Sequence, residues 1–140
     1  QKDGFARKVM AILDKGDGRR IGVWGLAFKP QTDDLRDAPS IAVIRQLLRE
    51  GFKIKAYDPM VNSKAKLLLP QVKFCSNPYA AAKGCDALVV FTEWNEFREV
   101  DFDRVKQALR RPVIIDGRNI FSADVLHDHG IKYHCVGVKS

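Results

Sequence analysis

Short apolar runs recur along this chain, and the stretches between them carry apolar residues at helical spacing. The apolar runs span residues 19–24, 52–57, 72–74, 87–91, 112–115 and 131–136, and each has the length of a strand. Helical spacing, or residues that typically start and stop helices, mark 3–15, 38–51, 67–69, 77–82, 102–109 and 122–126. Strands and helices therefore alternate six times, which predicts an α/β fold with a parallel sheet.

The run Ala87–Phe91 is apolar at every position. A strand that is apolar on both faces is typical of a parallel sheet that helices cover on both sides. The expected fold is therefore a doubly wound, Rossmann-like parallel six-stranded sheet in the order 3-2-1-4-5-6, with helices on both faces. The sequence contains no internal repeat and no low-complexity linker that would divide it.

The loop after the first predicted strand is unusually long. It runs from Gly25 to the helix start at Pro39, and it carries the cations Lys29 and Arg36 among several aspartates. Connections between a strand and a helix usually take about 2–6 residues. A loop of this length with two cations favours ligand binding over a purely connecting role.

Ligands of doubly wound sheets bind beyond the carboxyl ends of the strands, where the strand order reverses. With the expected order, the loops after Trp24, Phe91 and Ile115 meet at that point. They carry Phe28, Lys29, Arg36, Thr92, Glu93, Trp94, Asp116, Gly117 and Arg118. Because three of these residues are cationic, we expect a phosphate-bearing ligand whose aromatic or sugar portion lies against Phe28 or Trp94.

The first loop does not carry the glycine fingerprint of a dinucleotide site. That fingerprint is G-x-G-x-x-G, whereas this turn has only Gly22 and Gly25, followed by larger residues. Asp58, after the second strand, resembles the acid that binds a ribose, but it lacks the accompanying glycine loop. We therefore expect lysine and arginine side chains, rather than backbone N–H groups, to hold the phosphates.

Each of these cations also has a simpler interpretation. Lys29 fits equally well as a solvated loop residue, Arg36 as a local partner of Asp33 or Asp34, and Arg118 as a turn residue. No combination of residues forms a general base with a nucleophile, or a metal site. Sequence reasoning therefore assigns no catalytic residue and no metal ligand, and it predicts a domain that binds a substrate or effector without performing chemistry alone.

Composition narrows the expected partners. The chain has 24 lysines and arginines against 17 aspartates and glutamates, a net charge of +7, but these cations are scattered. We therefore expect no nucleic-acid partner. No apolar run approaches the roughly 20 residues of a membrane span, so we expect no membrane partner and a cytoplasmic location. Cys75, Cys85 and Cys135 lie in or beside predicted strands and are each interpreted as small buried hydrophobic residues.

The segment 25–40, GLAFKPQTDDLRDAPS, closely resembles the C-terminal, UDP-binding domain of the UDP-glucose/GDP-mannose dehydrogenase family. The resemblance extends over nearly the whole chain and includes AYDP (56–59), GCDALVVFTEW (84–94) and IDGRNI (115–120). AYDP and FTEW are most similar to the bacterial UDP-glucose 6-dehydrogenase branch. The GDP-mannose branch, the UDP-N-acetyl-aminosugar branch and a stand-alone nucleotide-sensing module stay open as alternatives.

The resemblance implies an enzyme that oxidises the C6 hydroxyl of a UDP-sugar to a carboxylate in two steps with two NAD. It places the nucleophilic cysteine and most of the NAD contacts in N-terminal and central domains that this chain lacks. By the resemblance, Phe28, Lys29 and Arg118 contact the UDP-sugar, and Arg36 reaches the NAD.

The family also suggests how this chain fits into a longer protein. Residues 1–18 match the connecting helix from the absent central domain, and 19–140 match the UDP-sugar-binding domain. Because the family usually dimerises through the central domain, the full-length protein is expected to be a homodimer or a larger oligomer.

Overall fold

The computed structural model describes residues 2–13, 19–27, 35 and 38–136. Its strands are β1 (Arg20–Trp24), β2 (Lys53–Tyr57), β3 (Lys73–Phe74), β4 (Ala87–Val90), β5 (Val113–Asp116) and β6 (Lys132–Cys135). Its helices are α1 (Lys2–Leu13), α2 (Pro39–Arg49), α3 (Asn62–Leu68), α4 (Pro78–Ala82), α5 (Asn95–Arg98), α6 (Phe102–Ala108) and α7 (Ala123–Asp128). The predicted strands are confirmed to within one or two residues at each end.

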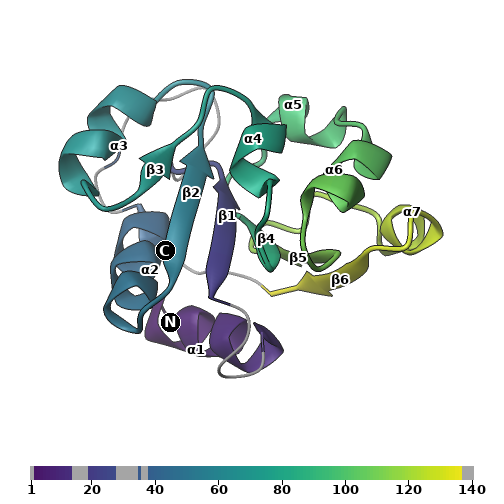
Figure 1. Ribbon diagram of the computed structural model, residues 1–140, viewed down its shortest axis with the longest axis horizontal. Coiled ribbons are helices and arrows are strands. Elements are labelled where there is room, and N and C mark those ends of the chain that lie inside the picture. Colours follow the sequence, from purple (N-terminus) through teal and green to yellow (C-terminus); the bar gives the residue numbers. More distant parts are fainter. Residues whose placement is uncertain (1, 14–18, 28–34, 36–37, 137–140) are drawn as a thin grey trace.

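The six strands form one parallel sheet in the order β3-β2-β1-β4-β5-β6, as the sequence predicted. Figure 1 shows α1 and α2 on one side of the sheet and α4, α5 and α6 on the other. The strand order reverses between β1 and β4, so the carboxyl ends of these strands are the expected ligand position.

Two hydrophobic clusters, one on each face, hold the sheet between its helices. In β1, Ile21 and Val23 belong to the cluster that contains α1 and α2, whereas Trp24 belongs to the cluster that contains α4, α5 and α6. All four residues of β4 are buried. This double burial explains why the fourth strand is apolar without alternation.

Helix α1 is part of the first cluster. Phe5 is 2% exposed, and its ring centroid lies 5.4 Å from that of Phe91 at the end of β4. The helix therefore packs against the same core as the sheet. The division at residue 18 between a connecting helix and a binding domain stays a prediction.

Two local expectations were wrong. Residues 95–98 form the short helix α5, although the sequence indicated only a loop there. Four residues are too few to show a helical period, so this helix left no pattern in the sequence. Cys135 is exposed, whereas Cys75 and Cys85 are buried as expected. The difference arises because β6 is an edge strand with only partial cover.

Candidate functional site

The start of the long loop after β1 is held by side chains from three other elements. The N–H of Leu26 donates to Oδ2 of Asp58, after β2, at 2.8 Å. The carbonyl of Leu26 accepts from the hydroxyl of Ser40 in α2, and the carbonyl of Ala27 accepts from the hydroxyl of Thr92, after β4. All three side chains are at most 2% exposed. The position from which Phe28 and Lys29 continue is therefore fixed by buried polar contacts.

Close packing accounts for both glycines of this strand end. A Cβ atom on Gly22 would lie 2.5 Å from the carbonyl oxygen of Ala81 in α4. A Cβ atom on Gly25 would lie 2.5 Å from the Cβ of Thr92, and Gly25 also has a φ of 85°. Helix α4 and the loop after β4 thus both approach the β1 backbone at positions where only glycine fits.

Asp58 is a structural residue. Besides Leu26, its carboxylate accepts the N–H groups of Met60 at 2.8 Å and Val61 at 3.1 Å. Three backbone donors therefore occupy its two oxygens, and its side chain is buried. The similarity of Asp58 to a ribose-binding acid is thus explained by its role in holding two loops together.

The loop after β5 is organised around a single buried carboxylate. Asp116 is 0% exposed, and its two oxygens accept four backbone N–H groups and one phenol. The donors are Arg118 N at 2.8 Å, Asn119 N at 2.8 Å, Ile120 N at 2.7 Å, Phe121 N at 3.2 Å and Tyr133 Oη at 2.7 Å. Burial and the adjacent Asp116 raise the pKa of Tyr133, so its hydroxyl stays protonated and donates. These contacts fix the backbone that carries Arg118.

Arg118 lies beside the loop after β4. Its Nη2 is 3.2 Å from Oε1 of Glu93, and its side chain is 26% exposed. The N–H of Gly117 also donates to the carbonyl of Val90 at 2.8 Å, which ties the same two loops together. A guanidinium has five N–H donors in a planar fork. One arginine side chain is therefore able to contact a carboxylate and a phosphate oxygen together.

Two aromatic residues, Trp94 and Tyr57, lie beside the short helix α5. The indole nitrogen of Trp94 is buried and has no hydrogen-bond partner among the described residues. The hydroxyl of Tyr57, at the end of β2, donates to Glu96 in α5 at 2.9 Å. Burial, with the adjacent Glu96 carboxylate, raises the pKa of Tyr57 above its usual value. Helix α5 is thereby anchored to the sheet edge.

The structure brings together the loops after β1, β4 and β5, as the sequence predicted. Thr92 joins the loops after β1 and β4, and Glu93 joins the loop after β4 to Arg118. Phe28, Lys29 and Arg36 lie outside the described residues. Sequence reasoning missed the structural roles of Asp58, Thr92, Ser40 and Asp116. For Asp58, Thr92 and Asp116 the available signal was a polar residue at or just after the end of a buried strand, and this signal does not distinguish a ligand contact from a loop anchor. Ser40 lies in the first turn of α2 and carries no such signal.

Other kinds of site have little support in the part of the chain that the structure describes. It contains no group of three or more histidine, cysteine or acidic side chains with the spacing to hold a metal ion. None of its helices combines the length and apolar character that crossing a bilayer requires.

The chain was compared with the models of known protein families. The model of the UDP-glucose/GDP-mannose dehydrogenase family, UDP binding domain, matches residues 22–123. The chain belongs to this family. The match includes all three loops of the site, and it confirms the resemblance that segment 25–40 indicated.

Individual relatives within the UDP-glucose/GDP-mannose dehydrogenase family agree. The chain is 44% identical over 139 residues to a UDP-glucose 6-dehydrogenase of Rhizobium meliloti and 41% identical over 138 residues to one of Bacillus subtilis. Each alignment covers 98% of this chain, but only 32% and 30% of those proteins. The chain therefore spans about a third of the length of these relatives.

A solved structure shares the fold. A UDP-glucose dehydrogenase from the archaeon Pyrobaculum islandicum superimposes with a TM-score of 0.77 at 28% identity. The superposition covers 97% of this chain and 29% of that one. The sheet order and its flanking helices are thus those of one domain within a larger family member.

Proposed function

We propose that this chain is the nucleotide-sugar-binding domain of an NAD-dependent UDP-glucose 6-dehydrogenase, which converts UDP-glucose and two NAD to UDP-glucuronate. Oxidation of a primary alcohol to a carboxylate removes two hydrides, and therefore needs two NAD. The catalytic residues and most NAD contacts belong to N-terminal and central domains of a longer protein. This segment alone is inactive, and its work is to bind and orient the UDP-sugar.

The observation that carries this proposal is the position of Arg118 on the loop after β5, in contact with Glu93 of the loop after β4. A diphosphate brings about two negative charges, and binding it requires cations with good hydrogen-bond geometry. Arg118 sits on a backbone that Asp116 fixes, next to Glu93. A guanidinium held in place loses less conformational entropy on binding than a free one, so the geometry favours a substrate contact.

Phe28 and Lys29 are proposed to contact the same UDP-sugar. They follow directly on Ala27, whose carbonyl is anchored by Thr92. Lys29 would supply a point charge to the phosphates, and Phe28 an apolar surface to the base or sugar. Both roles extend the resemblance to segment 25–40, which the family match supports.

NAD does not fit the first strand–helix turn of this chain. The turn has no glycine-rich phosphate loop, and the Asp58 carboxylate already accepts three backbone N–H groups. We therefore place NAD mainly on the N-terminal domain of the longer protein, with Arg36 of this chain reaching it. The proposed assembly is a cytoplasmic homodimer or larger oligomer, with no nucleic-acid partner.

UDP-glucose is the favoured substrate within the family. The curated relatives at 44% and 41% identity are UDP-glucose 6-dehydrogenases. A UDP-D-ManNAc dehydrogenase of Pyrococcus horikoshii superimposes with a TM-score of 0.73 at 27% identity, close to the 0.77 and 28% of the Pyrobaculum islandicum UDP-glucose dehydrogenase. The solved structures therefore do not separate the two branches, and the preference for the glucose branch rests on the curated relatives.

The test is NAD reduction by the full-length protein with UDP-glucose, GDP-mannose and UDP-N-acetylmannosamine as separate substrates. We expect UDP-glucose to give the highest kcat/KM, with two NADH formed per sugar oxidised. Lys29→Ala should raise the KM for UDP-glucose, whereas Lys66→Ala, on the exposed side of α3, should leave it unchanged. Preference for another sugar nucleotide would overturn the substrate assignment, and an unchanged KM in Lys29→Ala would overturn the role of that lysine.

A further inference from the structure

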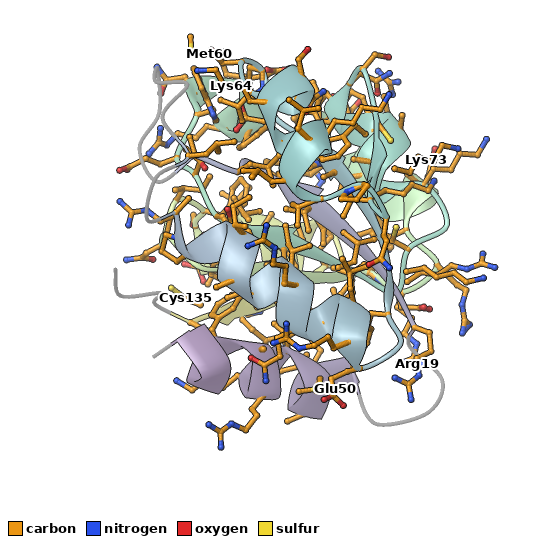
Figure 2. All side chains as sticks on the ribbon, turned by 90° about the vertical axis from the view of Figure 1, so that its left-hand side faces the viewer. Arg19, Glu50, Met60, Lys64, Lys73 and Cys135 are labelled. Atoms are coloured by element: carbon orange, nitrogen blue, oxygen red, sulfur yellow. The ribbon has the colours of Figure 1, made fainter. Side chains whose placement is uncertain are left out.

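A cavity lies at the edge of the sheet opposite the candidate site, where the strands begin. Its volume is about 570 Å³, within the range of small-molecule sites. Figure 2 shows Arg19 and Lys73, near the amino ends of β1 and β3, extending to the right, whereas Cys135, at the carboxyl end of β6, lies to the left. The cavity is thus separated from the Arg118 loop by the length of the strands.

Five cationic side chains line this cavity. They are Arg20 of β1, Lys53 and Lys55 of β2, Lys73 of β3 and Lys83 after α4. We call this set the basic pocket. The sheet register makes Arg20 the partner of Lys53, and Lys55 the partner of Lys73. Like charges in register on one face of a sheet destabilise it, so the arrangement costs folding energy.

No carboxylate among the described residues lines the basic pocket. Asp86, directly before β4, is the carboxylate at the start of the neighbouring strand. It already binds Arg110 at 2.7 Å and accepts the backbone N–H of Arg20 at 3.0 Å. Cys85 also lines the cavity, but burial raises the pKa of its thiol to about 11, so it stays neutral at pH 7. The repulsion between the cations is therefore not relieved from within the pocket.

The simplest explanation of these five cations is a solvated basic surface. One of them, Lys55, also stabilises the fold. The ammonium of Lys55 donates to the carbonyl of Lys83 at 2.7 Å and so caps the end of α4. Lys53, Lys73 and Lys83 are exposed, and no salt bridge holds them among the described residues. A solvated surface does not require a cavity, however. This cavity also has an apolar side, formed by Leu48, Phe52 and Ile54.

We propose that the basic pocket binds a small phosphorylated molecule that carries at least two negative charges. Its phosphates would lie among Lys53, Lys73 and Lys83, and its uncharged part against Leu48 and Phe52. The concave shape and limited volume favour a small ligand over a nucleic acid, which would need a longer basic surface. The site is separate from the proposed UDP-sugar site, so both can be filled together.

The experiment is calorimetric titration of the full-length protein, presaturated with UDP and NAD, with inorganic triphosphate and, separately, with ATP, both without Mg²⁺. We expect one further site per chain, with affinity that falls as salt rises. Tighter binding of ATP than of triphosphate would assign the apolar side to a nucleoside, and equal binding would assign the site to free phosphate chains.

The variant for this test is Lys53→Gln/Lys73→Gln, and the matched control is Lys66→Gln/Lys132→Gln, which removes the same charge elsewhere. The pocket variant should weaken the second site by about tenfold or more, and the control should not. An unchanged UDP affinity in the pocket variant would show that the protein is folded. Equal effects of both variants, displacement of UDP by the probes, or tighter binding of a single-stranded oligonucleotide than of ATP would each overturn the proposal.

Discussion

The two edges of the sheet use charge in opposite ways. At the carboxyl edge, Asp58 and Asp116 are buried, and their oxygens are filled by backbone N–H groups of the loops that they hold. At the amino edge, five cations surround a cavity with no lining carboxylate among the described residues. At the carboxyl edge, the charged side chains bind backbone groups and so fix the loops. At the amino edge, the positive charges have no lining carboxylate beside them, and an anionic ligand is able to neutralise them.

The largest effect is expected from the buried carboxylate of the carboxyl edge. Asp116→Ala would leave four backbone N–H groups and the hydroxyl of Tyr133 without their acceptor. We expect the free energy of unfolding to fall by about 3 kcal/mol or more, because each buried unsatisfied donor costs about 1–3 kcal/mol and part is recovered by water. Urea unfolding measures this change.

The control for that variant is Asp124→Ala, which removes an exposed aspartate from the first turn of α7. It should cost less than about 1 kcal/mol. If the two variants were equally stable, Asp116 would not organise the loop that carries Arg118, and the contrast between the two edges would lose its strongest example.

A smaller effect is expected from a pair of glycines, one at each edge. Gly25, after β1, has a φ of 85°, and Gly84, before β4, has a φ of 74°. A Cβ atom on Gly25 would collide with Thr92, whereas one on Gly84 would meet nothing within 4 Å. Gly84→Ala should therefore cost about 1 kcal/mol, for the backbone conformation alone.

Gly25→Ala should cost at least about 1 kcal/mol more than Gly84→Ala, because the loop after β4 must also move. Thermal unfolding of both variants measures the difference. Equal costs would mean that Thr92 shifts freely, and that the start of the first loop is less constrained than the contacts of Leu26 and Ala27 indicate.

The sequence predicted the sheet well because its central strands, β1 and β4, are buried on both faces. The run Ala87–Phe91 gave both the parallel sheet and the position of the fourth strand, and the reversal of strand order then indicated where the candidate site lies. The aspartates were harder to interpret. An aspartate directly after a strand serves equally as a ligand contact or as an acceptor for loop N–H groups, and only the folded backbone distinguishes these roles for Asp58 and Asp116.

The basic pocket was out of reach for a related reason. Its cations come from β1, β2, β3 and the end of α4, and in the sequence they appear as scattered surface charge. Strand register brings Lys55 next to Lys73, although 18 positions separate them along the chain. Composition gave the net charge, but only the sheet topology shows where the cationic side chains lie close together.

The central claim is that UDP binds at the carboxyl edge through Arg118. The most direct measurement compares the UDP dissociation constants of Arg118→Ala and Arg98→Ala by calorimetry. Both arginines contact Glu93, at 3.2 and 3.6 Å, but Arg98 lies on α5 and is 41% exposed. We predict that Arg118→Ala weakens UDP binding by about tenfold or more and that Arg98→Ala changes it by less than about twofold. Equal effects, or no effect of Arg118→Ala, would contradict the account.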